Sequence, residues 1–175
     1  NINKKLVNLL SYLNDSKQLK EKQRDELYDI IIANSIYSVQ QGSVEEIEKY
    51  NILRTSLLTM QRACFNIINK IEKKDFLIVV DGNKKIPNFQ YNQQAIIKGD
   101  SKSASIAAAS ILAKVSRDKF MIELDKKFPQ YFWAENKGYM TKKHFDAVDK
   151  YGLTKWHRKS FFKKHFSSSK QLTLL

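Results

Sequence analysis

The feature of this 175-residue chain that most constrains its fold is a short apolar run that ends in an acidic residue. Phe76–Val80 is continuous, rich in β-branched side chains, and followed by Asp81 and Gly82. A run of this length and composition is typical of a strand buried on both faces of an α/β sheet. A shorter run, Ala95–Ile97, leads in the same way to Asp100. The sequence therefore predicts two strands of an α/β fold, each followed closely by a carboxylate.

Helical patterns and one weaker strand pattern surround these two runs. Residues 34–41 alternate weakly and predict a further strand. Apolar residues at helical spacing predict the helices, and capping residues and Pro or Gly mark their ends. We predict helices over 19–32 with Asp15 or Ser16 as cap, after a Ser43–Glu46 capping box, over 101–128 before Pro129, and over 141–151 before Gly152.

Composition restricts the class of protein and the kind of partner. Thirty-one Lys and Arg against 18 Asp and Glu give a net charge of +13, which favours a polyanion such as nucleic acid as partner. The alternative is a generally lysine-rich protein without a polyanionic partner. A single cysteine, Cys64, excludes an internal disulfide framework, and its place in a helical apolar pattern indicates a core residue. No apolar run approaches the roughly 20 residues that a membrane-spanning helix needs.

Asp81 and Asp100 are the candidate chemical site. Because ligand sites in open α/β sheets lie at the carboxyl ends of the strands, we expect these two carboxylates to meet there. Two close carboxylates repel each other unless a cation lies between them, and Mg²⁺ and Mn²⁺ prefer such oxygen ligands. Together with the basic charge, this pattern points to metal-dependent phosphodiester chemistry. The alternative is structural: Asp81-Gly82 is also a turn signal, and Asp100 is also a candidate helix cap.

A longer string of motifs resembles bacterial ribonuclease HII, and its segments follow the family's order over nearly the whole chain. The segments that carry the resemblance are Leu13–Leu19, Tyr50–Leu53, Met60–Ala63, Val80–Asn83, Lys98–Asp100, Ser105–Asp118, Lys137–Tyr139, Thr141–His144 and His157–Phe161.

The resemblance implies a ribonuclease H-like fold: a mixed sheet flanked by helices, with a helical C-terminal extension. It also implies endonucleolytic cleavage of RNA in RNA–DNA hybrids and incision at ribonucleotides embedded in duplex DNA. The family site uses four carboxylates and two divalent ions, Mn²⁺ or Mg²⁺. Asp81 matches the third carboxylate and Asp100 the fourth. Tyr139 matches a tyrosine that packs on the ribose, the sugar whose 2′-OH separates RNA from DNA.

Four basic residues within these motifs are candidates for phosphate contacts that give affinity without sequence specificity: Lys17, Lys137, Lys142 and Arg158. The alternative for each is an ordinary solvated side chain. We interpret His144 and His157 as structural residues or phosphate contacts rather than metal ligands, because Mg²⁺ prefers oxygen. We expect a monomer in the cytoplasm, with a nucleic-acid duplex and no membrane as partner.

One family segment has no counterpart in these 175 residues. The family's first two carboxylates are an adjacent Asp-Glu followed by Gly-Arg-Gly, and the only adjacent pair, Asp25-Glu26, lies in a predicted helix without those glycines. We therefore expect a fold that lacks its first strands, with weak metal binding and little cleavage by this chain alone. The alternative function is an impaired fragment that only binds nucleic acid. A second departure is Asn136, where the family often has histidine.

The resemblance also implies a division of the chain. We predict a ribonuclease H-like catalytic domain, N-terminally incomplete, over residues 1–128, a helical extension over 129–166, and a flexible tail over 167–175.

Overall fold

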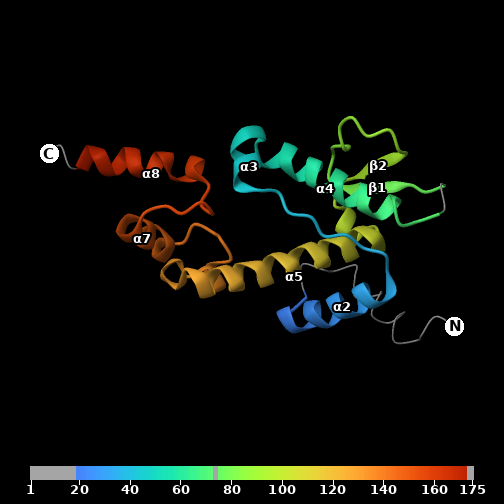
Figure 1. Ribbon diagram of the computed structural model, residues 1–175, viewed down its shortest axis with the longest axis horizontal. Coiled ribbons are helices and arrows are strands. Elements are labelled where there is room, and N and C mark those ends of the chain that lie inside the picture. Colours follow the sequence, from blue (N-terminus) through green and yellow to red (C-terminus); the bar gives the residue numbers. More distant parts are fainter. Residues whose placement is uncertain (1–18, 73–74, 173–175) are drawn as a thin grey trace.

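The computed structural model describes residues 19–72 and 75–172, which form several helices and a small sheet at one end of the molecule (Figure 1). The elements in chain order are α2 (Glu21–Asn34), α3 (Val44–Tyr50), α4 (Ile52–Ile68), β1 (Ile78–Asp81), β2 (Gln93–Ile96), the 3₁₀ helix η2 (Gly99–Ser101), α5 (Ala104–Lys127), the 3₁₀ helix η3 (Pro129–Tyr131), α6 (Trp133–Asn136), α7 (Lys142–Tyr151) and α8 (Lys159–Leu172).

The sheet confirms the two strands predicted from the apolar runs. β1 pairs with β2 in parallel, in a register that sets Ile78 opposite Gln93 and Asp81 opposite Ile96. Over the described ranges the sheet is two-stranded and parallel, whereas a mixed sheet was predicted. β1 begins two residues later than the apolar run, and of its four residues Val80 alone is buried. The prediction of burial on both faces is therefore wrong for most of this strand.

Helix α5 passes through the middle of the molecule (Figure 1). The sheet lies near its N-terminal end, and α7 and α8 lie beyond its C-terminal end. Its first half buries Ala107, Ile111 and Val115 against α2, which contributes Leu27 and Ile31 to the same cluster. The helix ends at Lys127, and Pro129 follows after the Phe128 cap, as predicted, because proline has no N–H to continue the hydrogen-bond ladder.

The helix predicted after Ser43 is present but divided into α3 and α4. Ser43 and Glu46 form the predicted capping box, in which each side chain accepts a hydrogen bond from the other's backbone N–H. Asn51 interrupts the helix with a positive φ of 69°, and its side-chain oxygen then caps α4 by accepting from the N–H of Arg54 at 3.1 Å. With ψ at 166°, Asn51 has a backbone conformation that residues other than glycine rarely adopt, which marks a sharp break between the two helices.

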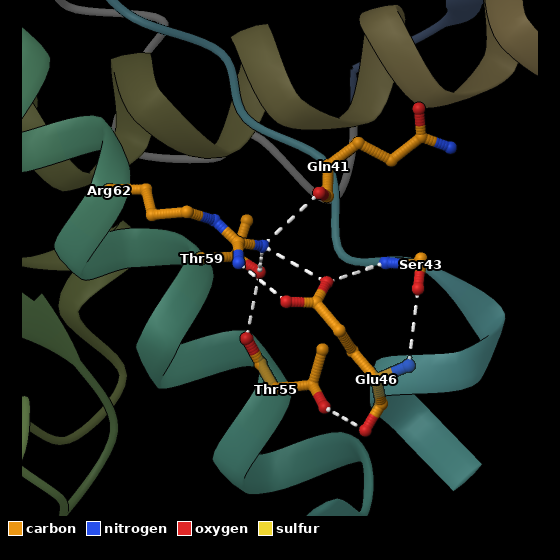
Figure 2. A network of polar contacts seen from close by, with 6 residues as sticks. All are labelled: Gln41, Ser43, Glu46, Thr55, Thr59 and Arg62. Atoms are coloured by element: carbon orange, nitrogen blue, oxygen red, sulfur yellow. Dashed lines mark hydrogen bonds and ion pairs between the residues drawn. The ribbon is translucent and has the colours of Figure 1, made fainter. Parts of the chain in front are cut away.

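A polar network fixes α3 against α4 across this break (Figure 2). The Arg62 guanidinium donates to both carboxylate oxygens of Glu46, at 2.5 and 3.2 Å, and to the Gln41 carbonyl at 3.2 Å. The buried Thr55 hydroxyl donates to the Glu46 carbonyl at 3.0 Å. Because Glu46 takes part in both the capping box and the ion pair, the start of α3 is tied to the middle of α4.

The strand predicted over residues 34–41 is wrong. Asn34 completes α2, and residues 36–43 form an irregular connection. Ile36, Tyr37 and Val39 are exposed, at 56%, 38% and 40% of their surface. A strand needs a paired neighbour and a buried face, and weak alternation supplies neither. The predicted α2 is confirmed; it begins at Glu21 after Lys20, and the proposed caps Asp15 and Ser16 lie outside the described residues.

The C-terminal part is helical, as expected, and surrounds an aromatic core. α7 begins after a Thr141 cap and ends before Gly152, close to the predicted bounds. Helix α8 was not predicted, and it includes residues 167–172 of the expected flexible tail; residues 173–175 lie outside the described ranges. The buried members of this core are Met121, Leu124, Tyr131, Trp133, Ala147, Val148 and Phe162. The domain division at residues 128 and 129 stays a prediction.

Candidate active site

The first candidate residue, Asp81, is placed by strand pairing. It is the last residue of β1, and the following Gly82 N–H donates to the Ile96 carbonyl at 2.9 Å, so both strands end at one edge. The Asp81 side chain is exposed at this edge, and its Oδ1 accepts a hydrogen bond from the Gly99 N–H at 2.8 Å. One carboxylate oxygen is therefore oriented by the backbone next to Asp100.

The second candidate, Asp100, lies in η2, between the end of β2 and the start of α5. Lys98 takes a left-handed conformation, with φ 54°, which turns the chain back from β2. A Cβ on Gly99 would lie 2.5 Å from Ile106 Cδ1 and 3.2 Å from Asp81 Oδ1, so a larger residue would force the Ile106 side chain to shift and would crowd Asp81. Asp100 is 7% exposed. The structure thus brings Asp81 to the residue that precedes Asp100.

Two carboxylates at one strand edge suit a hard divalent cation that takes its other ligands from water and substrate. Mg²⁺ keeps several waters and is held by one or two carboxylates together with substrate phosphates. Among residues 19–72 and 75–172, no cluster of three or more His, Cys, Asp or Glu side chains could hold a metal ion. The Gly99 N–H links Asp81 to the segment that carries Asp100, and the role of the two carboxylates as metal ligands stays a prediction.

Tyr139 lies in a tight loop between α6 and α7, and 70% of its surface is exposed. Lys137 and Gly138 both have positive φ, 50° and 82°. The Gly138 N–H donates to Asn136 Oδ1, and the Tyr139 N–H donates to the Asn136 carbonyl, each at 2.8 Å. The loop thus holds a large aromatic side chain in solvent on a closely hydrogen-bonded backbone.

His144 and His157 are buried, with ring centroids 5.2 Å apart. His144 Nδ1 lies 3.0 Å from the Tyr131 carbonyl, and His157 Nδ1 accepts from the Thr154 N–H at 2.9 Å. Burial, together with the nearby His144, lowers the pKa of His157 to about 4. Both rings are hydrogen-bonded parts of the aromatic core, which agrees with a structural role rather than metal ligation.

Arg158 lies in a basic cleft of about 600 Å³ between the α3–α4 junction and the start of α8. Its guanidinium carbon lies 3.7 Å from the Phe161 ring centroid, and burial lowers its pKa. The other cationic residues lining this basic cleft are Lys49, Arg54 and Lys163. The carboxylate of Glu48 lines it too and accepts from the Ser160 hydroxyl at 2.7 Å.

The remaining predicted phosphate contacts are dispersed. Lys142 is exposed at the first position of α7, and Lys137 is half-buried in the Tyr139 loop. Lys17 lies outside the described residues. The sequence motifs identified Arg158 but not the cations beside it, because Lys49 and Arg54 stand more than about 100 residues away in the chain and Lys163 lies just beyond the His157–Phe161 motif.

Comparison with known proteins decides the family. The family model described as ribonuclease HII matches residues 2–169. The chain belongs to the ribonuclease HII family. The ribonuclease H-like α/β fold expected from the motifs is thereby confirmed, and the chain is assigned to a family of divalent-metal-dependent hydrolases.

Individual ribonuclease HII relatives match most of the chain. The protein named ribonuclease HII from Pelagibacter ubique is 50% identical over 149 residues, which cover 85% of this chain and 78% of the relative. The one from Endomicrobium trichonymphae is 46% identical, covering 87% and 71%. The one from Fusobacterium nucleatum is 44% identical, covering 94% and 77%. No helix in the described part of this ribonuclease HII chain is both long and apolar enough to cross a membrane.

Proposed function

We propose that this protein is an endonuclease that hydrolyses the RNA strand of RNA–DNA hybrids and incises duplex DNA at embedded ribonucleotides. The observation that carries the proposal is the hydrogen bond between Asp81 Oδ1 and the Gly99 N–H, because it joins the two carboxylate motifs at one strand edge. Membership of the ribonuclease HII family supports the same reaction. We further propose that the protein acts as a monomer in the cytoplasm.

Asp81 and Asp100 would hold the divalent ions, Mn²⁺ or Mg²⁺. When bound there, such ions stabilise charge on the phosphoryl group and favour ionisation of water at neutral pH. Asp81 suits this role because its Oδ1 is oriented by the Gly99 N–H and its side chain is exposed. Asp100 suits it because its position is fixed between β2 and α5. In the reaction, water adds to phosphorus and the bond to the 3′-oxygen breaks, leaving 5′-phosphate and 3′-hydroxyl ends.

The other predicted residues would bind and orient the duplex. Tyr139 presents an exposed ring that fits against a ribose. Arg158 lies in the basic cleft, where Lys49, Arg54 and Lys163 add positive charge suited to backbone phosphates. Lys17, Lys137 and Lys142 are further proposed phosphate contacts. All of these contacts give affinity and register, while the carboxylate edge selects the bond that is cut.

The test is substitution of each carboxylate in the full-length protein. Asp81→Asn and Asp100→Asn keep the size of the side chain but remove its charge. Each should lower kcat on a duplex with one embedded ribonucleotide more than about 100-fold, because even substitution of a residue that hydrogen-bonds to a metal ligand typically lowers activity about 10–100-fold. Duplex affinity measured by fluorescence anisotropy should stay within about threefold. Asp118→Asn is the matched control, because Asp118 pairs with Lys114 on α5. Retained turnover in either site variant would refute the assignment.

A further inference from the structure

The loop that carries Tyr139 has, at Lys137, a backbone conformation that residues other than glycine do not favour. Lys137 has φ 50°, a left-handed value that brings its Cβ too close to the following carbonyl oxygen. Gly138 follows with φ 82°. Such conformations persist where surrounding contacts over-determine them. The contacts that impose this one come from two residues without a role in the proposed chemistry, Asn136 and Arg117.

Asn136 holds the loop from within. Its side chain is 6% exposed, and it bonds in two directions: Oδ1 accepts from the Gly138 N–H, and Nδ2 donates to the Tyr131 carbonyl, both at 2.8 Å. The Asn136 carbonyl accepts from the Tyr139 N–H as well. A single amide therefore ties the backbone on either side of Lys137 to the aromatic core.

Arg117 holds the loop from outside. It projects from α5, and its Nη2 donates to the Lys137 carbonyl at 3.2 Å. A Cβ on Gly138 would lie 3.1 Å from Arg117 Nη2 and 3.1 Å from Met121 Cε, so the loop sits tightly against α5. The same helix begins just after Asp100. α5 thus gives the loop and the carboxylate edge a common rigid support.

We propose that Asn136 and Arg117 are positioning residues that fix the direction of the Tyr139 side chain for contact with the ribose. This inference rests on the proposed function, because it assigns these residues a purpose through Tyr139. An exposed ring on a rigid backbone binds with less loss of conformational entropy than one on a free loop. Asn136 does what a mobile loop could not: it aligns Tyr139 before the substrate arrives.

The test is a double-mutant cycle in the full-length protein, with Asn136→Ala, Tyr139→Ala and the pair, assayed on a duplex with one ribonucleotide. We expect Asn136→Ala to lower kcat/KM about 10–100-fold in the presence of Tyr139, as misplacement of a substrate contact does. In the Tyr139→Ala background the same change should cost less than about threefold. Asn66→Ala, at an exposed asparagine on α4, is the control and should leave both values unchanged.

Arg117→Ala keeps the inference testable if loss of Asn136 prevents folding, because Arg117 is exposed and its removal leaves the core intact. It should show a smaller loss, about 3–10-fold, with the same dependence on Tyr139. Equal losses with and without Tyr139 would overturn the inference alone. Full activity of Tyr139→Ala would overturn it together with the role of Tyr139, whereas the Asp81 and Asp100 variants test the proposed nuclease independently.

Discussion

The carboxylate edge and the Tyr139 loop place their functional side chains by different means. At the edge, the backbone places the side chain: the parallel strands end together, and the Gly99 N–H orients Asp81. The core beneath this edge is small and includes Val80, Ile86 and Phe89. At the loop, a buried amide and a large aromatic core hold the backbone while Tyr139 stays exposed. The difference shows that a side chain at the end of a strand can be placed by few contacts, whereas a side chain on a loop needs many.

The largest expected effect is a loss of stability when the aromatic core that supports the Tyr139 loop is disturbed. Phe162 is fully buried in that core, so Phe162→Ala should lower the free energy of unfolding by about 3–5 kcal/mol. Phe161 is the matched control: it is 46% exposed and contacts Arg158, and its change to Ala should cost no more than about 1 kcal/mol. Urea denaturation of both variants measures the difference. Similar losses would mean that the core does not support this end of the molecule.

A second expected effect is a pH dependence of stability that arises in the aromatic core and not at the carboxylate edge. The pKa of His157 is about 4 in the folded protein and about 6.5 in the unfolded chain, so the unfolded chain binds more protons between these values. Stability should therefore fall by about 2–3 kcal/mol as pH drops from about 6.5 to 4. His157→Gln should flatten this part of the stability profile, measured by urea denaturation at each pH. An unchanged slope would contradict burial of a neutral His157.

The smallest expected effect perturbs the carboxylate edge. Gly99→Ala would force a Cβ against Ile106 and Asp81 Oδ1, and overpacking of this kind typically costs about 1–3 kcal/mol. Because the clash displaces Asp81, kcat should fall at least about 10-fold on a ribonucleotide duplex. Gly152→Ala is the control: its φ of 78° brings strain, but no neighbouring atom lies within 4 Å, so stability should drop while kcat holds. Equal kcat values would show that Gly99 does not position Asp81.

Much of this fold was readable in the sequence where local and long-range requirements agree. The apolar runs before Asp81 and Asp100 predicted two strands with carboxylates at one edge, and Pro129 predicted the end of α5. The weak alternation over residues 34–41 led to a wrong strand prediction, because strand formation depends on a neighbouring strand that local sequence does not specify. Helix α8 was not predicted, because its sequence is rich in Lys and Ser. Its apolar side is recognisable only from the packing of Phe162 in the core.

The residues of the candidate site also differ in whether the sequence identified them. Asp81 and Asp100 were identified by their positions after the apolar runs, and the family resemblance identified Tyr139. The roles of all three residues stay predictions. Arg117 and Asn136 gave no signal of their own: a buried amide is recognisable as a support only when the carbonyl and N–H groups it joins are seen together. Asn136 also stands where the family often has histidine, a departure that the sequence left without an interpretation.

The most direct measurement of the central claim is the position of Mn²⁺ in crystals of the full-length protein, found by its anomalous scattering. The account predicts a peak within about 2–2.3 Å of carboxylate oxygens of Asp81 and Asp100, the range typical of hard divalent cations on oxygen. In Asp100→Asn crystals this peak should weaken or vanish. A manganese peak away from both side chains, or one undiminished by that substitution, would contradict the account.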